Sequence, residues 1–385
     1  MALLASAAVP TAKPYPFSPL LRAGKQLNQT SFRPFVETSS SLTSTHRAAG
    51  FSPLRNRPAT VVASGEGAPV VEETATSPQP ASKETGDKRI LLSDVVVTRP
   101  TNVYSAERAW TSLDLGTAAA VAGIHGLALF APFTFNWDAF WVAVDLYVVT
   151  GLLGITLSYH RNLSHRSFKL PWLLEYVFAY CGLQSLQGNP IDWVSTHRHH
   201  HRFCETERDP HSPTEGFWFS HFSWLFDSKT LNEKCGGRNN VADMEQQAYY
   251  RFLEKTYIFH PIALGALLYA LGGFPYVVWG MGVRTCAVYH ATWLVNSGGH
   301  VWGDRVWRTG DLSRNNWFNA LITFGDGWHN NHHAFEFSAK HGLEWWQFDV
   351  TWYLIKLLEG VGMASDIKLP TEAQKQQKAL ENMAA

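Results

Sequence analysis

Long apolar runs alternate with polar segments along this chain of 385 residues. Residues 115–133 include no charged side chain, and residues 140–158 include only Asp145. Each run approaches the roughly 20 residues that a helix needs to cross a bilayer. Residues 257–295 form a longer apolar block, interrupted by glycine, proline and one arginine, with room for two helices and a tight turn. The pattern predicts an all-α integral membrane protein with four transmembrane helices.

The polar segments predict a helical domain that caps the spans on one side. Residues 159–255 and the end of the chain are largely polar. Within this region, residues 171–186 are mostly apolar but include Glu175, which favours an amphipathic or re-entrant helix. Two spans separate the segment after the second run from the segment after the fourth, so both segments lie on the same side. We expect the membrane domain to cover residues 96–370, followed by a polar C-terminal tail at 371–385.

The N-terminal region has the composition of a targeting segment. Residues 1–64 are rich in basic residues, serine and threonine, and their only acidic residue is Glu37. This composition is typical of an organelle transit peptide, and the stretch at 61–64 resembles a plastid cleavage region. Residues 65–95 are rich in Pro, Glu, Thr and Ser, as in a disordered linker that cannot bury a core. We therefore expect a multi-pass protein of a chloroplast membrane.

Composition narrows the function classes. The formal net charge is +0, so no global charge favours nucleic acid as a partner. Aromatic residues make up 14% of the chain and include 16 tryptophans, which favour membrane interfaces. A mean hydropathy of −0.14 fits a few spans attached to a large polar domain. The four cysteines show no paired motif, which favours free thiols.

Histidines are concentrated in three clusters that all fall on the predicted side of the cap. On a helix, positions i, i+3 and i+4 share one face. That phase aligns His197, His200 and His201 in the second cluster and His329, His332 and His333 in the third. It turns His199, in the second cluster, away from the shared face. The five-residue spacing of the first pair does not share a helical face well and suits a helix end, where the second span leaves the membrane. The candidate residues are His160 and His165, then His197, His200 and His201, then His329, His332 and His333.

These side chains predict a site for two metal ions. Neutral imidazole binds iron, zinc, copper and nickel, and one zinc ion needs only three or four protein ligands. His300, at the end of the fourth span, would add a ligand, and Asn296, one turn earlier, would touch a metal directly or through water. A zinc hydrolase or a non-redox membrane receptor is the alternative from a different class. We expect packing or surface roles for His125, His211, His221, His260, His290 and His341.

A metal site beside an apolar bundle favours oxidative chemistry on a lipid chain. Removing hydrogen from an unactivated methylene needs an oxidant stronger than any side chain, so the metal must carry the chemistry. A pair of iron ions that uses O₂ and two electrons would supply that oxidant, while the protein places the chain and excludes water. The expected substrate is a lipid whose tail is dissolved in the bilayer.

Several motifs, in this order along the chain, resemble one enzyme family. They are GLLGITLSYHRNLSHRSFK, GLQSLQGNPIDWVSTHRHHH, WLVNSGGH and RNNWFNALITFGDGWHNNHHAFEFSAKHGLEWWQFD. From about residue 100 to residue 370, the chain resembles the plant and cyanobacterial acyl-CoA-desaturase-like (fatty acid desaturase type 1) family. The resemblance implies four transmembrane helices under a polar cap, two Fe²⁺ ions, a bent acyl tunnel, and O₂-dependent insertion of a cis double bond into a lipid-bound saturated acyl chain.

The resemblance also implies roles for individual residues. The family's metal ligands fall on the eight aligned histidines and on His300, with Asn296 acting through a bound water. Gln187 and Trp193 match positions that line the tunnel near its bend. No catalytic residue beyond these ligands is implied.

Electron donor and substrate follow from the same resemblance. The sequence carries no HPGG haem-domain signature, so a separate donor is needed, which in a plastid would be ferredoxin. The expected product carries the double bond at carbon 7 of palmitate on a galactolipid. The alternatives are a double bond at carbon 9, acyl-CoA as the carrier of the chain, and a hydroxylase on the same scaffold. Candidates for the donor's docking face, or for contacts with lipid phosphate, are Arg161, Arg166, Lys169, Arg198 and Arg202.

Overall fold

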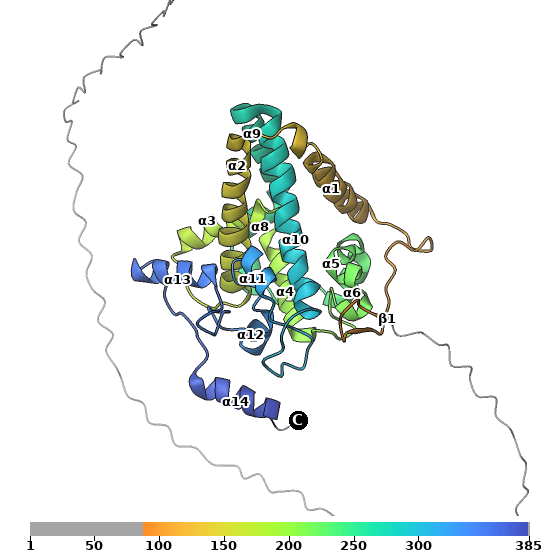
Figure 1. Cartoon of the computed structure of the whole chain (residues 1–385). Helices are drawn as coiled ribbons and strands as arrows, with labels where there is room; N and C mark the ends of the chain where they lie inside the picture. Colours follow the sequence, from red (N-terminus) through yellow and green to blue (C-terminus); the bar gives the residue numbers. More distant parts are fainter. Residues whose placement is uncertain (1–87, 384–385) are drawn as a thin grey trace, which may run out of the picture. The chain divides into compact units, whose positions relative to one another are not determined.

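The computed structural model describes residues 88–383, which are mostly helical. The predicted transit peptide at 1–64 lies outside the described residues, as does most of the predicted linker. The apolar helices gather into an upright bundle above a layer of shorter helices and loops (Figure 1). The bundle contains α1 (Ser112–Ala128), α2 (Trp137–Tyr147), α9 (Phe259–Val277) and α10 (Arg284–Asn296).

Three helical segments of the described chain are long and apolar enough to cross a membrane. They are Ser112–Phe133, Trp137–Ser164 and Phe259–His300. The third has 42 residues and contains a backbone break at Gly272 and Gly273, where φ is −148° and +64°. The positive φ at Gly273 is the left-handed region that favours glycine. The break therefore lies within α9, and it separates residues 259–271 from the part of the segment that continues into α10. It falls at the position where the sequence predicts a turn.

The second long segment changes its helical geometry near the site. After α2 the chain continues as a π-helix, η2 (Val148–Ser164), whose hydrogen bonds join residues five apart. The amide of His165, the C-cap, donates to the carbonyl of His160 at 3.2 Å. His165 does lie at a helix end, as expected. The expectation that residues five apart do not share a helical face well is wrong here, because the wider π-helix places His160 and His165 one above the other.

A close backbone contact holds η2 against α3 (Trp172–Leu183). A Cβ on Gly154 would lie 2.5 Å from the amide nitrogen of Gly182, and a Cβ on Gly182 would lie 2.4 Å from the ring of Tyr159. Glycine at both positions lets the two backbones approach. Tyr159 is fully buried in the core that η2, α3 and α4 (Pro190–Phe203) share.

Folded structure begins closer to the N-terminus than the predicted linker boundary. Strands β1 (Lys88–Arg89) and β2 (Val96–Val97) pair antiparallel. Ile90 and Val95, in the turn between them, are buried against Val301. The predicted linker boundary at residue 95 is therefore too late, because its last residues contribute to a core. This two-stranded hairpin is also a small exception to the all-α prediction.

Shorter elements complete the layer below the bundle and its connections. The 3₁₀ and π segments are η1 (Ala131–Phe133), η3 (Pro213–Glu215), η4 (Ser223–Phe226), η5 (Val278–Val283) and η6 (Gly298–His300). The helices are α5 (Phe217–His221), α6 (Ser228–Cys235), α7 (Ala242–Glu245), α8 (Ala248–Thr256), α11 (Trp317–Ile322), α12 (His329–Ala334), α13 (Val350–Gly360) and α14 (Glu372–Met383). The last of these forms from the polar C-terminal tail.

Candidate metal centre

Five histidines from three elements converge in a first group. Helix η2 and its C-cap supply His160 and His165, α4 supplies His197 and His201, and α12 supplies His332. One ring nitrogen of each lies within 4.8 Å of the others. The Nε2 atoms are 2.8 Å apart in the pair His165–His197 and 3.0 Å apart where His332 meets His160 and His201.

Four more histidines form a second group beside the first. The Nε2 atom of His329 lies 3.0 Å from that of His300 and 3.1 Å from that of His333. The ring of His200 lies 5.3 Å from that of His300 and 5.4 Å from that of His333, measured between ring centroids. The thiol of Cys204 lies 3.7 Å from Nε2 of His200. All four cysteines of the chain are free, as predicted.

The two groups share helices, because neighbouring positions on α4 and α12 point to different groups. On α4, His201 belongs to the first group and His200 to the second. On α12, His332 belongs to the first and His333 to the second. His199 lies away from both, buried with its ring 4.6 Å from that of Phe203. Helical phase therefore places His199 where the sequence predicts.

Four carboxylates accept hydrogen bonds from Nδ1 of site histidines, and histidine spacing predicts none of the four. Hydrogen bonding at Nδ1 orients each ring and leaves the Nε2 lone pair facing inward. The separation in sequence between histidine and carboxylate ranges from 9 residues for His200 and Asp209 to 166 for His160 and Asp326. The pairs are His160–Asp326 at 2.8 Å, His200–Asp209 at 2.9 Å, His300–Glu205 at 2.7 Å and His333–Asp311 at 2.9 Å.

This pattern of donors and acceptors fits bound cations. His300 and His333 donate Nδ1–H to carboxylates, so each has a bare lone pair on Nε2. Both lone pairs point at Nε2 of His329, which carries at most one hydrogen. At least one of these close contacts therefore lacks a hydrogen, whichever tautomer His329 adopts. Two nitrogen ligands that each lie about 2.1 Å from one ion, at right angles to each other, would be about 3.0 Å apart. The Nε2 atoms of His329, His300 and His333 have this separation.

Burial makes most of these rings poor bases. Burial first, and then neighbouring imidazoles, lower the pKa well below the usual histidine value, so the rings are neutral, as metal binding requires. His200 is an exception, since Asp209 outweighs burial and raises the pKa of His200. The rings with a strongly lowered pKa are His165, His197, His329, His332 and His333.

Arg161 links the first histidine group to the segment that contains Ala339 and Asp349. Its guanidinium lies 2.9 Å from carboxylate oxygens of both Asp326 and Asp349 and donates to the carbonyl of Ala339 at 2.8 Å. Burial alone would raise the pKa of Asp326, but His160 and Arg161 hold it well below its usual value. Arg161 is 0% exposed. Its predicted place on a docking face is therefore wrong.

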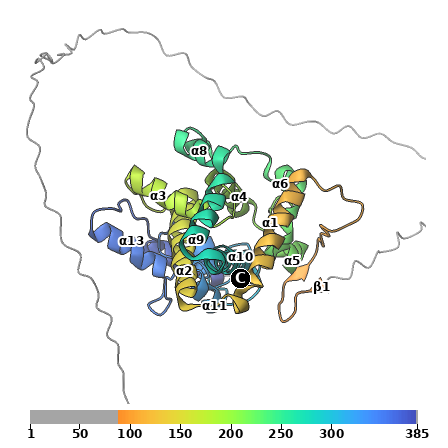
Figure 2. The ribbon, with the colours of Figure 1, turned by 90° about the horizontal axis from the view of Figure 1, so that it is seen from above.

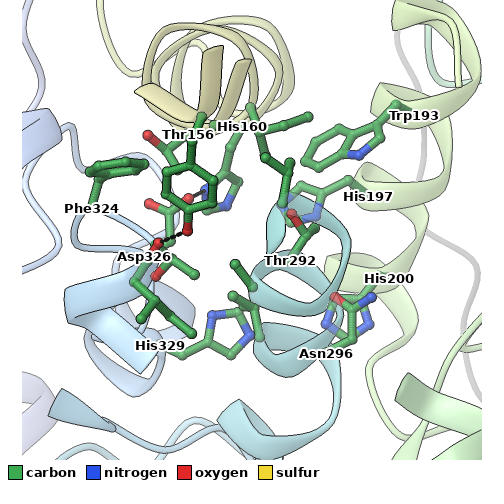
Figure 3. A pocket seen from close by; sticks show the side chains of 18 residues that line it. Thr156, His160, Trp193, His197, His200, Thr292, Asn296, Phe324, Asp326 and His329 are labelled. Atoms are coloured by element: carbon green, nitrogen blue, oxygen red, sulfur yellow. Dashed lines mark hydrogen bonds and ion pairs between the residues drawn. The ribbon is translucent and has the colours of Figure 1, made fainter. Parts of the chain in front are cut away.

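Both groups line one cavity, and the space within its lining, open solvent at its mouth included, is about 570 Å³. Figure 3 shows His160 and His197 of the first group and His200 and His329 of the second facing this space. The hydroxyl of Tyr147 donates to the carbonyl of Ile322 at 2.5 Å on the cavity wall. The other apolar lining residues include Gly151, Ile155, Val288, Ala291, Val295 and Phe324.

The remaining predicted site residues lie at or behind this cavity. Asn296, the last residue of α10, lines it beside His200 (Figure 3). Trp193 lines it and stacks on His197 with ring centroids 5.1 Å apart. Gln187 lies behind the wall and donates to the hydroxyl of Thr292 at 2.9 Å.

Two histidines that the sequence assigned to packing or surface roles lie against the site instead. The ring of His341 lies 4.4 Å from that of His332, and its Nδ1 is 3.1 Å from a carboxylate oxygen of Asp326. The ring of His211 lies 4.3 Å from that of His200. Neither belongs to a histidine cluster in the sequence, so spacing alone gave no signal.

Comparison with known proteins agrees with this geometry. Residues 135–358 match the family model described as fatty acid desaturase. The chain is 63% identical over 299 residues to the chloroplastic palmitoyl-monogalactosyldiacylglycerol delta-7 desaturase of Arabidopsis thaliana, covering 78% of this chain and 81% of that one. It is 59% identical over 290 residues to an acyl-CoA 5-desaturase of Anemone leveillei, covering 75% and 90%. It is 56% identical over 274 residues to delta-9 acyl-lipid desaturase 1 of Arabidopsis thaliana, covering 71% and 90%.

The matched region contains both histidine groups and the cavity between them. The chain therefore belongs to the fatty acid desaturase family and is an oxidoreductase that introduces double bonds into fatty acyl chains.

Proposed function

We propose that the protein forms the delta-7 double bond of palmitate carried on monogalactosyldiacylglycerol in a chloroplast membrane. The 63% identity to a relative named for that reaction supports this substrate. The composition of residues 1–64 supports the compartment. Other relatives are named as a delta-9 acyl-lipid desaturase and an acyl-CoA desaturase. The alternative is therefore a double bond at carbon 9, or an acyl chain carried on CoA.

The observation that carries the proposal is the pair of histidine groups on one apolar cavity. Imidazole nitrogens bind iron as well as zinc, copper and nickel, and the oxidative chemistry of the family selects iron among these metals. Two bound Fe²⁺ ions would supply, from O₂ and two electrons, the oxidising power that removes one hydrogen from each of two adjacent methylenes. The proposed ligands are His160, His165, His197, His201 and His332 for one ion, and His200, His300, His329 and His333, with Asn296 through water, for the other.

The chain's own groups orient the ligands and the substrate. The carboxylates on Nδ1 fix the ring orientation of their histidines. The apolar cavity wall holds the acyl chain and keeps water from the reacting carbons. Trp193 and Thr292 form part of that wall, and Gln187 ties them together, since Trp193 Nε1 donates to Gln187 Oε1 at 3.4 Å.

We also propose a multi-pass topology with four spans and a polar cap that holds the metal site. A straight helix of 42 residues would extend about 63 Å, roughly twice the bilayer core. The break at Gly272 and Gly273 divides this segment into residues 259–271 and 274–300. The second part suits one crossing, and the first reaches the roughly 20 residues of a crossing only together with the residues that precede it. Four spans place all site histidines on one side, as a single site requires.

The proposed electron donor is ferredoxin, docking near the first histidine group. Arg202 is exposed next to His201, and Arg166 is partly exposed next to His165. An acidic donor protein complements such positive charges. Arg166 and Arg198 are less available than Arg202, because Asp243 pairs with both guanidiniums, Glu175 also pairs with Arg166, and backbone carbonyls bind Arg198.

Lipid profiling tests the proposed substrate. The full chain would be expressed in plastids that lack delta-7 desaturation, followed by analysis of acyl chains on each lipid class. We expect a new cis double bond at carbon 7 of palmitate, confined to monogalactosyldiacylglycerol. A double bond at carbon 9, or products on acyl-CoA, would contradict the proposed substrate and support the alternative. A hydroxy fatty acid without an alkene would contradict desaturation itself.

A further inference from the structure

The first described residues of the chain lie against the turn that carries His300. Residues 88–101, here called the N-terminal clasp, begin with the hairpin of β1 and β2. Ile90 and Val95 of this hairpin share a small core with Val301, the residue that follows His300. Figure 2 shows this orange segment beside α5. The clasp is therefore next to a proposed ligand of the second ion.

Polar contacts tie the hairpin to the same turn. The hydroxyl of Ser93 donates to the carbonyl of Val301 at 3.3 Å. Asp94 forms an ion pair with Arg314, and the amide of Arg314 donates to the carbonyl of Gly299 at 2.7 Å. These contacts reach the residues on both sides of the proposed ligand, so the clasp restrains the turn from which its ring extends.

Glu205 connects two proposed ligands of the second ion. One carboxylate oxygen of Glu205 accepts from Nδ1 of His300 at 2.7 Å. The amide of Glu205 donates at 2.8 Å to Asp209, whose other carboxylate oxygen accepts from Nδ1 of His200 at 2.9 Å. One residue thus orients His300 through its side chain and His200 through its main chain.

The backbone of Glu205 adopts a conformation that needs support from the clasp. Its φ is +55°, in the left-handed region that residues other than glycine rarely adopt. Such a backbone persists only where surrounding contacts hold it. The carbonyl of Glu205 accepts from Nη2 of Arg99 at 2.7 Å, and the same nitrogen donates to the hydroxyl of Thr214 at 2.9 Å. Arg99 therefore holds the residue that orients both ligands.

A second branch of the clasp supports the acceptor of His200. The hydroxyl of Thr101 donates to one carboxylate oxygen of Glu215 at 2.7 Å, and Lys234 pairs with the other. The ammonium of Lys234 also donates to the carbonyl of Asp209 at 3.0 Å. Glu215 is buried, so this branch runs through the interior of the cap to the second histidine group.

The first histidine group is held by other residues. Its acceptor Asp326, which binds Nδ1 of His160, contacts Arg161 and His341. These side chains come from η2 and from the segments on either side of α12. The two histidine groups therefore have separate supports, and the clasp contributes to that of the second group.

We infer that the N-terminal clasp, through Arg99 and Thr101, positions the ligands of the second iron ion. The inference rests on the proposed two-ion site. Arg99 acts through Glu205, so its loss weakens binding of the second ion while the first keeps its affinity. The predicted cleavage region at 61–64 lies upstream of the clasp, and removal of the predicted targeting segment there would leave this support in place.

Titration of the purified, metal-free full chain with Fe²⁺ in the absence of oxygen tests this role. The wild-type chain should bind two ions. Arg99→Met keeps a long side chain but removes the donors, so it should weaken one ion by about 10-fold and leave the other unchanged. Arg99→Lys retains a cationic donor and should restore most of that affinity. Equal weakening of both ions, or wild-type affinities in Arg99→Met, would overturn the inference.

A second-group ligand variant identifies which ion Arg99 supports. His333→Ala removes a proposed ligand of the second ion, so the ion of the first group should remain bound. Adding Arg99→Met to this background should leave the affinity of the remaining ion unchanged, because the two sites have separate supports. A further loss of affinity in the double variant would show that Arg99 supports the whole cap and would overturn the assignment.

Arg251→Met is the matched control, because Arg251 also donates to a backbone carbonyl, that of Glu245, but from α8. It should bind both ions as the wild type does. Thr101→Val, a milder change, should weaken the same ion less than Arg99→Met does, and it tests the inference even where the methionine variant does not fold.

Wild-type affinity for both ions in Thr101→Val, or an Arg99→Lys variant as weak as Arg99→Met, would also overturn the role of the clasp. A wild-type chain that binds fewer than two ions would instead overturn the proposed two-ion site. The two failures are therefore distinguishable, since the first concerns the variants and the second concerns the wild type.

Discussion

The carboxylates behind the histidines matter as much as the histidines they touch. Asp326 accepts from Nδ1 of His160 and also contacts Arg161 and His341, so it orients a ligand and neutralises a buried cation. Groups that hold metal ligands in this way typically contribute 10–100-fold to affinity. The chemistry at this scale depends on contacts between residues far apart in sequence.

Asp326→Asn should weaken iron binding by about 10–100-fold, because the amide neither matches the Nδ1–H donor as well nor balances Arg161. The measurement is iron per protein after dialysis against a chelator. Asp138→Asn, at an exposed carboxylate of α2, is the matched control and should leave iron content unchanged. Equal iron in both variants would contradict the role of Asp326.

Neighbouring histidines on α4 should respond differently to truncation. His200→Ala removes a proposed ligand and leaves Asp209 buried without its partner, so activity and iron content should fall sharply. His199→Ala removes a ring that packs on Phe203 and should lower stability without changing iron per protein. Metal analysis and thermal unfolding of both variants check this, and equal iron loss would refute the argument from helical phase.

Histidine clustering pointed to the eight candidate ligands of the three clusters, and the i, i+3 and i+4 pattern of a helix aligned those of the second and third clusters. His160, His165 and His300 do not follow that pattern. The carboxylates, Arg161 and His341 were not predictable in the same way. Their roles arise where loops from separate segments meet, and a single sequence contains no record of those contacts. Arg161 illustrates this limit of prediction, because the sequence alone allows an arginine beside a histidine cluster to lie either on the surface or in the interior.

At the scale of elements, the π-helix η2 determines how the first two ligands meet. Residues five apart are adjacent in such a helix, so His160 and His165 face the same ion site. Long apolar runs predicted that a helix occurs here, but its wider geometry depends on packing that hydropathy does not encode. The close crossing with α3 at Gly154 and Gly182 is part of that packing.

Gly154→Ala should destabilise the protein by about 1–3 kcal/mol, because its methyl group would overlap the α3 backbone. Thermal unfolding of the purified full chain is the measurement. Gly123→Ala in α1 is the control, since a Cβ there meets no atom within 4 Å and alanine favours helix by about 0.5–1 kcal/mol. A neutral Gly154→Ala variant would show that the crossing relaxes.

At the scale of the whole molecule, the proposed site requires an even number of crossings between its histidine clusters. Sequence patterning predicted the apolar segments, and the break in the last one lies where glycine and proline interrupt the run. Hydropathy does not reveal that α10 ends in the turn that carries His300, which brings the last span directly to the metal site.

Single cysteines in a variant without native cysteines would report the sidedness. Lys340→Cys, below the bundle, and Thr134→Cys, between the first two spans, should react with a membrane-impermeant maleimide from opposite sides of sealed membranes. Four crossings require this result. Labelling of both positions from the same side would contradict the proposed topology.

The buried Arg161 has a consequence for biosynthesis. Its two carboxylate partners, Asp326 and Asp349, lie 165 and 188 residues later in the chain. A ribosome has therefore made nearly the whole membrane domain before this cation can be neutralised and before His160 gains its orienting acceptor. Full pairing of Arg161 consequently waits for Asp349, and a chain that terminates before Asp349 carries every proposed histidine ligand yet leaves Arg161 with one of its two carboxylate partners.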